Sequence, residues 1–283
     1  MKRILKFSKM VASGNDFVII EARNVTTSPG HKILAKRICH RKSGAGADGM
    51  LLLEKSKKSD LRMRVFNADG SEAEMCGNGA RCAALYWGRN VATSQRRRYK
   101  LIIQTKAGII RSEVLGDNVK IKLTDPKKLK LNIPIKFKDR ILHVNFINSG
   151  VPHAVIFVEG LNKIDLLTLG RYIRYHRKFA PAGTNVNLVE VQNKKSLKIR
   201  TYERGVEDET LACGTGAVAA ALITSSQLSL PVRQAGAFSS QQINVHTKSG
   251  EVLRVYFNRI KNNFNDVWLE GKVKIVYKGE YHV

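Results

Sequence analysis

The chain alternates short apolar runs with polar or charged stretches, and this pattern predicts many strands and few helices. Short runs rich in β-branched and aromatic residues, bounded by polar residues or glycine, are typical of strands. We expect strands over 17–20, 50–53, 62–66, 100–103, 118–123, 154–158, 186–191, 197–202, 252–257 and 272–277. Apolar residues at helical spacing predict helices over 29–39, 79–87, 164–175 and 216–225.

This mixture predicts an α/β fold of the mixed α+β kind, rich in antiparallel strands. A length of 283 residues favours two domains. The apolar share of 43% and the charged share of 25% are ordinary for a globular chain, which argues against disorder. No apolar run approaches the ~18 residues that a membrane span needs. Lys6, Lys9 and Asp16 interrupt the apolar residues near the start, so we expect no signal peptide.

The charge is the unusual part of the composition. The chain has 49 Lys and Arg against 23 Asp and Glu, a formal net charge of +26. The densest basic runs are residues 55–58, 96–100, 127–130 and 194–195, and we interpret them as solvated turns between strands. Aromatic residues do not interleave with these runs, as a stacking platform for bases would require. We therefore do not expect nucleic acid as a partner.

The four cysteines are too sparse for a disulfide scaffold, and no Cys-x-x-Cys pair predicts a zinc site or a redox motif. Free thiols in this number favour a reducing, cytoplasmic setting. Cys39 and Cys82 stand among apolar residues at helical spacing, so we expect them to be buried packing residues. Cys76 and Cys213 have a different context.

Two segments resemble each other around Cys76 and Cys213. Residues 64–80 and 200–217 each contain a predicted strand, an acidic turn, Cys-Gly-x-Gly and the start of an alanine-rich helix. The two cysteines are 137 residues apart. A second pair of similar segments, 46–52 and 183–189, fits the same offset. Two matches at one offset predict an internal duplication, with a boundary near residues 124–126.

A cysteine at the first turn of a helix lies at the positive end of the helix dipole, which is expected to lower the thiol pKa. The glycines leave backbone N–H groups free to hold an anion. Two such thiols acting from opposite sides suit inversion of a stereocentre, in which one removes a proton and the other delivers one. A nucleophilic cysteine paired with His153, and a redox pair, are alternatives, but they leave one motif or the paired glycines unexplained.

At these residues the chain resembles the diaminopimelate epimerase family, over nearly its whole length. The shared motifs are Ser13–Phe17 (SGNDF), Gly46–Gly49 (GADG), Phe66–Cys82, Ser149–His153 (SGVPH), Gly183–Asn187 (GTNVN) and Glu203–Gly216. The resemblance implies a cofactor-free enzyme, without a metal, that interconverts LL- and meso-2,6-diaminopimelate for lysine synthesis. It also implies two pseudo-symmetric domains, each with strands wrapped round a central helix and the site in the cleft between them.

The implied domains are 1–123, with strand 272–283 returning to it, and 124–271. Carried over by position, Cys76 and Cys213 form the acid–base pair. The implied substrate-binding residues are Asn15, Asn67, Gly77, Asn78, Asn185, Glu203, Arg204, Gly214 and Thr215. Among these, Arg204 suits the distal carboxylate, and Glu203 suits an ammonium group. His153 is implied in a supporting role, either positioning groups or tuning a cysteine.

Two positions depart from the family pattern. Val151 stands where many members have Asn, so this side chain donates no hydrogen bond, and Gly49 stands where some members have Gln. A related proline or hydroxyproline racemase also uses two cysteine motifs and is the alternative function. The expected partner is a small molecule rather than a membrane, and a homodimer is compatible with the resemblance.

Overall fold

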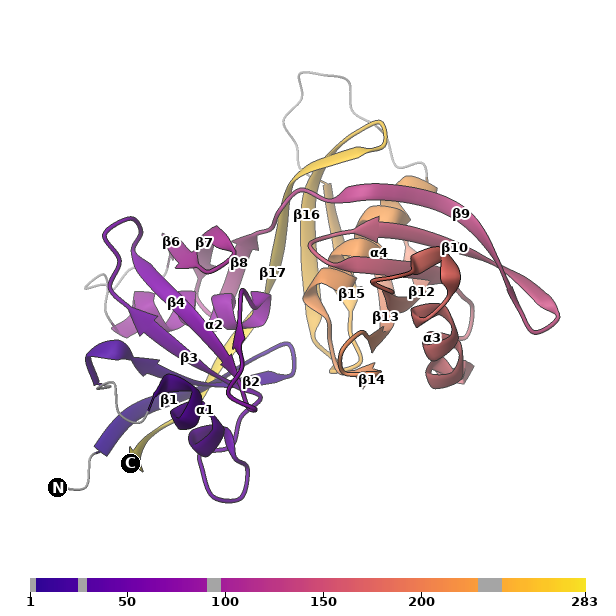
Figure 1. The fold of residues 1–283 in the computed structure, drawn as a ribbon. Coiled ribbons are helices and arrows are strands. Elements are labelled where there is room, and N and C mark those ends of the chain that lie inside the picture. Colours follow the sequence, from indigo (N-terminus) through magenta and orange to yellow (C-terminus); the bar gives the residue numbers. More distant parts are fainter. Residues whose placement is uncertain (1–3, 25–29, 91–97, 229–240) are drawn as a thin grey trace. The chain divides into compact units, whose positions relative to one another are not determined.

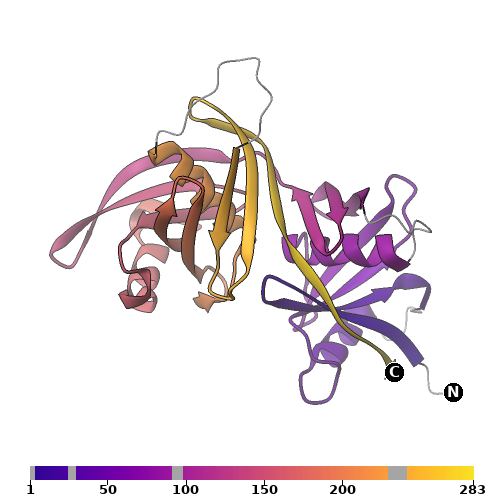
Figure 2. The same cartoon turned by 180° about the vertical axis from the view of Figure 1, so that it is seen from behind.

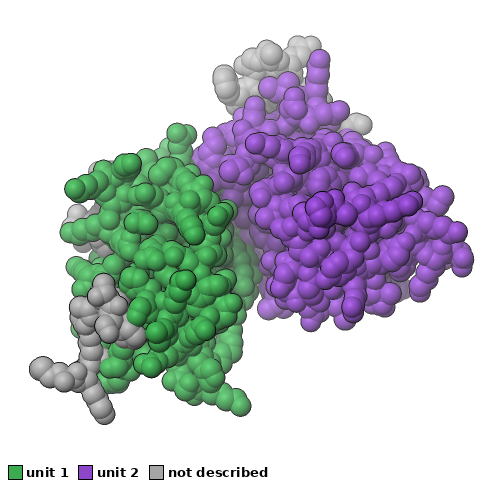
Figure 3. Space-filling model, in the orientation of Figure 1, with its two compact units in different colours: residues 1–121, 271–283 green, residues 122–270 purple. Residues whose placement is uncertain are grey.

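The computed structural model describes residues 4–24, 30–90, 98–228 and 241–283, and the chain divides into two compact units. Unit 1 contains residues 1–121 and 271–283, and unit 2 contains residues 122–270 (Figure 3). The long strand β17 (Asn263–His282) belongs to both units, because its first residues lie in unit 2 and the rest in unit 1 (Figure 2).

Unit 1 is a sheet built around one central helix, α2 (Gly77–Asn90). Its other elements are β1 (Ile4–Ala12), β2 (Asn15–Glu21), α1 (His31–Cys39), β3 (Gly49–Glu54), β4 (Leu61–Asn67), β5 (Glu72–Ala73), β6 (Arg98–Thr105), β7 (Gly108–Leu115) and β8 (Asn118–Lys122). The strand order is β1-β2-β3-β4-β6-β7-β8, and β17 pairs with both β8 and β1. The sheet therefore closes around α2, which contacts β1, β2, β4, β6 and β7 (Figure 1).

Unit 2 repeats this plan around α4 (Gly214–Gln227). Its other elements are β9 (Lys127–Phe137), β10 (Arg140–Asn148), β11 (Pro152–Phe157), α3 (Leu166–Arg174), β12 (Asn185–Asn193), β13 (Ser196–Glu203), β14 (Asp208–Thr210), β15 (Gln241–His246) and β16 (Val252–Ile260). The strand order is β9-β10-β11-β12-β13-β15-β16-β17. In unit 1, β2 pairs in parallel with β3, which pairs antiparallel with β4. In unit 2, β11 likewise pairs in parallel with β12, which pairs antiparallel with β13.

The two central helices are built to be enclosed. Residues 216–225 of α4 are all buried, and α2 buries residues 78–85 with almost no break. A helix whose residues are buried on all sides must be covered on all sides, and small alanine and glycine side chains let strands approach it closely. The predicted mixed α+β fold with two pseudo-symmetric, strand-wrapped halves is confirmed.

The predicted elements all overlap observed ones, although Pro29 lies outside the described residues. The sequence pattern missed several strands, among them β1, β7, β9, β10 and β15. The prediction that residues 127–130 form a turn is wrong, because they begin β9, which pairs with β10. Residues 194–195 do form a turn, and residues 55–58 lie in a loop. In the run 96–100, residues 98–100 begin β6 and the first two lie outside the described residues.

Candidate active site

Each unit places one cysteine directly before its central helix. In unit 2 a short hairpin of β13 and β14 leads into Cys213, which caps α4 with extended backbone angles. The Cys213 carbonyl accepts the N–H of Ala217 at 2.9 Å. In unit 1, β4 and β5 lead into Cys76 in the same way, and its carbonyl accepts the N–H of Ala80 at 2.8 Å. Each thiol is thus held at a helix N-terminus.

The helix amides reach the sulfur atoms themselves. The Gly79 N–H donates to Cys76 Sγ at 3.4 Å. The amides of Thr215 and Gly216 donate in the same way toward Cys213 and act to lower its thiol pKa. Gly77 and Gly214 are the first residues of the two helices, so the remaining free amides lie beside the thiols. Such an end is suited to hold a carboxylate next to sulfur.

An arginine–glutamate pair braces each hairpin. Arg64 donates Nε and Nη2 to the two carboxylate oxygens of Glu72 at 2.8 and 3.0 Å. Arg200 does the same to Glu209 at 2.7 and 3.0 Å. These contacts lower the pKa of both Glu72 and Glu209. Bidentate pairs fix orientation as well as distance, so each brace holds the strand that delivers its cysteine.

The electrostatics of Cys213 differ from the prediction. Burial and the nearby Glu203 carboxylate raise the pKa of the Cys213 thiol to about 12, although hydrogen bonds from Thr215 and the helix amides oppose the shift. The prediction that the helix end leaves this thiol with a lowered pKa is therefore wrong. Desolvation of a thiolate outweighs the helix dipole at this site. Burial also raises the pKa of Glu203 itself. Without a ligand, Cys213 is a neutral thiol.

The predicted substrate residues of unit 2 gather near Cys213. The Asn185 side chain is buried, donates to the Pro152 carbonyl at 2.9 Å and accepts the Arg204 N–H at 2.8 Å. The guanidinium of Arg204 donates to the Ala182 carbonyl at 3.0 Å. Asn185 therefore ties the start of β12 to the turn that carries Arg204.

His153 is fully buried on β11, and its Nε2 lies 3.0 Å from the Thr215 hydroxyl. Burial, with the Arg204 charge, lowers the pKa of His153 to about 3. The imidazole is therefore neutral at physiological pH. The Thr215 hydroxyl lies in turn 3.5 Å from Cys213 Sγ.

In unit 1 a chain of side chains orients two predicted amides. The buried guanidinium of Arg81 donates to Asn78 Oδ1 at 2.7 Å, and Asn78 Nδ2 donates to Asn15 Oδ1 at 2.5 Å. Asn15 Nδ2 donates to Asp48 at 3.3 Å, and Arg41 donates to the same carboxylate at 2.7 Å. A guanidinium only donates and a carboxylate only accepts. Arg81 and Asp48 therefore set both amide orientations from the two ends.

Asn67 is placed differently from these two amides. It is exposed at the end of β4, and its Nδ2 donates to the Ser71 hydroxyl at 2.9 Å within its own turn. The predicted residues thus form two groups. Unit 1 holds Cys76, Asn15, Asn67, Gly77 and Asn78, and unit 2 holds Cys213, His153, Asn185, Glu203, Arg204, Gly214 and Thr215. Cys39 and Cys82 are buried, which confirms their predicted packing role.

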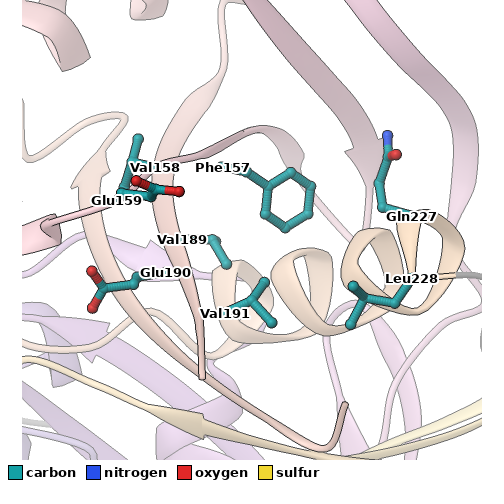
Figure 4. A pocket seen from close by; sticks show the side chains of 8 residues that line it. All are labelled: Phe157, Val158, Glu159, Val189, Glu190, Val191, Gln227 and Leu228. Carbon is teal, nitrogen blue, oxygen red and sulfur yellow. The ribbon is translucent and has the colours of Figure 1, made fainter. Parts of the chain in front are cut away.

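A cavity of about 410 Å³ in unit 2 is a separate feature (Figure 4). Gln227 and Leu228 line it at the far end of α4, whereas Cys213 precedes the first turn of that helix. A helix of 14 residues is about 21 Å long. The Glu190 carboxylate at its edge accepts the Gly160 and Leu161 amides at 2.7 and 3.2 Å. The cavity therefore does not belong to the Cys213 site.

Two features are absent from the described residues. Within these ranges no cluster of His, Cys, Asp and Glu has the arrangement to hold a metal ion. Of the described helices, none has the length and apolar character to cross a membrane.

The chain matches the sequence model for diaminopimelate epimerase over residues 7–129 and 145–276. It is 38% identical over 287 residues to the diaminopimelate epimerase of Aquifex aeolicus, covering 97% of each chain. It is 40% identical to that of Methanocella arvoryzae, covering 99% of this chain and 97% of the relative. This chain belongs to the diaminopimelate epimerase family.

Solved structures with low identity share the fold of this family. A phenazine biosynthesis protein of the PhzF family from Bacillus anthracis has a TM-score of 0.74 at 16% identity, covering 99% of each chain. A hydroxyproline epimerase from Agrobacterium vitis has a TM-score of 0.69 at 14% identity, covering 100% of this chain and 94% of its own. At these identities the similarity is one of overall fold alone.

Within the family motifs, the sequence gives no signal for several residues that organise the site. Asp48 and Arg81 lie inside quoted motifs, but only the structure shows that they orient Asn15 and Asn78. Asn187 closes the motif Gly183–Asn187 and bonds to His153, which no pattern in the sequence reveals.

Proposed function

We propose that this protein is a diaminopimelate epimerase that interconverts LL- and meso-2,6-diaminopimelate without a cofactor. Family membership over nearly the whole chain supports the substrate. The observation that carries the chemistry is the duplicated arrangement of Cys76 and Cys213. Each thiol precedes the central helix of its unit, with helix amides directed at sulfur.

Cys76 and Cys213 act as a two-base pair on the α-carbon. One thiolate removes the α-proton from one face, and the other thiol delivers a proton to the opposite face. The cysteines exchange protonation states in each turnover, and the reverse reaction restores them. Because the Cys213 thiol is favoured without a ligand, it is set to act first as the acid, and Cys76 as the base. The helix amides stabilise the negative charge that builds on the α-carboxylate.

The other predicted residues bind the substrate. Asn15, Asn67 and Asn78 supply amides from unit 1, and Asn185, Glu203 and Arg204 act from unit 2. Arg204 pairs with the distal carboxylate, since guanidinium matches that group in shape and charge. The amides of Gly77, Asn78, Gly214 and Thr215 hold the reacting carboxylate, and the Glu203 carboxylate takes an ammonium group. His153 supports the site without contacting the reacting carbon.

The test is proton exchange at the α-carbon. Purified enzyme with LL-diaminopimelate in deuterated water should replace the α-proton signal in the proton NMR spectrum by deuterium as the meso isomer appears. Cys76→Ala and Cys213→Ala should each abolish net epimerisation. The matched control is Cys82→Ala, which removes a buried thiol away from the helix start and should remain active. Loss of activity from only one of the first two variants would contradict the two-base mechanism.

A substrate panel separates the proposal from its alternative. Turnover of proline or hydroxyproline, with none of diaminopimelate, would assign the chain to the racemase chemistry that also uses two cysteines.

Activity that survives extensive dialysis against a chelator would support the absence of a metal cofactor. Activity that returns only when a metal is added back would contradict it.

The setting of the enzyme follows from the same residues. Residues 1–123 with 272–283, and 124–271, are its two functional domains, each with one catalytic cysteine. The free thiols support a cytoplasmic location. A homodimer is the expected oligomer, which sedimentation measures directly.

The net charge of +26 needs no nucleic acid partner, and a DNA titration at two salt concentrations should show no tight binding near physiological salt.

A further inference from the structure

A buried row of polar side chains lies behind Cys213 in unit 2. It begins at Asn187 on the central strand β12, continues through His153 on β11 and the hydroxyl of Thr215 on α4, and ends at the sulfur. The successive atoms are 3.1, 3.0 and 3.5 Å apart. Asn187 and His153 are fully buried. Because each of these groups can both donate and accept, the function of the row depends on its direction.

The Ala154 carbonyl fixes that direction. It lies 3.0 Å from one terminal atom of the Asn187 amide, and a carbonyl oxygen only accepts, so that atom is Nδ2. The other terminal atom is therefore Oδ1, which accepts the Thr201 hydroxyl at 3.0 Å. The second hydrogen of Nδ2 points at His153 Nδ1 at 3.1 Å. The amide is held on three sides and has one orientation.

The orientation of Asn187 selects the tautomer of His153. A ring nitrogen that accepts a hydrogen bond carries no proton, so the neutral imidazole is protonated at Nε2. The Nε2–H then donates to the Thr215 hydroxyl oxygen at 3.0 Å. The Thr215 hydroxyl cannot donate back to this nitrogen. Its own hydrogen is therefore available to the Cys213 thiolate, which can only accept, across the 3.5 Å between Thr215 Oγ1 and Cys213 Sγ.

We propose that Asn187 is a positioning residue of the epimerase site, which holds His153 in the Nε2–H tautomer so that the Thr215 hydroxyl donates to Cys213 and stabilises its thiolate. The catalytic meaning of this donation rests on the proposed function, since a two-base enzyme must form the thiolate once in every cycle. The hydrogen-bond direction itself does not depend on the substrate.

The surroundings of Cys213 explain why such a donor is needed. Burial and the Glu203 carboxylate on β13 both oppose a negative sulfur. The Arg204 charge acts on His153, and His153 on β11 is neutral. A hydroxyl directed at the sulfur supports the thiolate without adding a charge that would bind a carboxylate too tightly. A hydrogen bond to a charged group is also stronger than one to a neutral group.

The two units differ at this point. Gly216 approaches the Asn187 amide so closely that a Cβ at Gly216 would lie 2.5 Å from Oδ1. At the corresponding Gly79 in unit 1, the nearest neighbour is the methyl end of Leu51. Both units therefore have a glycine at this position, but Gly216 in unit 2 packs against the polar Asn187 amide, whereas Gly79 in unit 1 packs against the apolar Leu51. This difference points to a role specific to Cys213.

The first test reads the tautomer in the full-length protein by ¹⁵N NMR with labelled histidine. His153 is recognised because it should not titrate between pH 5 and 8, and because its signals vanish in His153→Gln. In the wild type, Nδ1 should be unprotonated and Nε2 should carry the proton. Asn187→Asp turns the donor into an acceptor and should move the proton to Nδ1. A wild-type signal showing Nδ1–H would overturn the proposal, as would an unchanged tautomer in Asn187→Asp.

The second test measures the thiolate of Cys213 by its rate of alkylation with iodoacetamide, followed by mass spectrometry of the peptide that contains it. Thr215→Val keeps the shape but removes the hydroxyl, and should slow alkylation at fixed pH about tenfold, which corresponds to one pKa unit. The conservative Thr215→Ser should retain the wild-type rate. Equal rates for Thr215→Val and the wild type would overturn the proposal. Neither test uses turnover, so failure of the proposed substrate would leave both readouts intact.

Discussion

The packing of Asn187 against Gly216 makes a sharp prediction for Gly216→Ala. The new Cβ would lie 2.5 Å from Asn187 Oδ1 and 3.3 Å from Cys213 Cβ, so the amide has to move. Asn187 makes hydrogen bonds with Thr201, Ala154 and His153, all between 3.0 and 3.1 Å. If the Asn187 amide moves by about 1 Å to relieve this contact, we expect at least two of the three hydrogen bonds to exceed the ~3.5 Å limit for donor and acceptor atoms.

The magnitude follows from these bonds. Each buried hydrogen bond contributes about 1 kcal/mol, and overpacking adds ~1–3 kcal/mol. Alanine in a helix recovers up to about 1 kcal/mol over glycine. We therefore expect Gly216→Ala to lower the free energy of unfolding of unit 2 by about 2–4 kcal/mol. The matched control is Gly79→Ala, whose Cβ would lie 3.0 Å from the flexible methyl end of Leu51. We expect that variant to change stability by no more than about 1 kcal/mol.

The two tryptophans allow each unit to be followed by itself. Trp87 lies in unit 1 and Trp268 in unit 2, and the chain has two tryptophans in all. Urea unfolding is recorded by fluorescence in a Trp87→Phe background for Gly216→Ala and in a Trp268→Phe background for Gly79→Ala. Similar losses in the two variants would refute the reasoning, because they would show that the polar contact behind Gly216 costs no more than the apolar one behind Gly79.

Three further predictions concern the brace, the amides and the histidine. Glu209→Gln should lower the free energy of unfolding of unit 2 by about 2 kcal/mol in urea, since Arg200 loses its charged partner. Because folding lowers the pKa of Glu209, this contribution is complete above pH ~4.5 and is lost as the pH falls through the pKa of the folded protein. Equal stability of the variant and the wild type at neutral pH would contradict the prediction. Asp48→Ala should raise KM about tenfold with a smaller change in kcat, because Asn15 loses the acceptor that orients its amide. An unchanged KM would show that the amide is held otherwise. The pKa of His153 is lowered to about 3, so the pH profile of kcat should lack a limb near 6.5 that belongs to this residue, and a limb that disappears in His153→Gln would disprove its neutrality.

Much of the fold could be predicted from the sequence because its strands are apolar runs. Residues 50–53 and 186–189 are buried on both faces, and their composition shows it. The β9 strand was missed for a physical reason. It carries exposed lysines and a proline, and only pairing with β10 gives it strand structure. Charge and periodicity describe a segment by itself, whereas pairing depends on a partner elsewhere in the chain.

In the candidate site, too, the features that are local in sequence could be predicted and those that depend on distant segments could not. The cysteine motifs are local, since a helix start and its glycines are adjacent in sequence, and they were predicted together with the duplication. The pKa of Cys213 was not, because the dipole is a local property whereas burial and the Glu203 charge come from other elements. Asn187 was overlooked for a similar reason. An asparagine inside a valine-rich strand has no visible role until His153 and Ala154 are placed beside it.

The strand β17 has a consequence for how the chain is made. Ile4 at the start of β1 pairs with His282, and Ala12 pairs with Val273. On the ribosome, β1 can pair with β2 at once, but its other neighbour emerges only when residues 273–282 have been synthesised. Unit 2 is contiguous in sequence from residue 122 to 270, so its strands wait for a shorter stretch of chain. An exposed strand edge invites incorrect pairing during this interval. The exposed Lys6 lies on β1, where its charge discourages association between nascent chains.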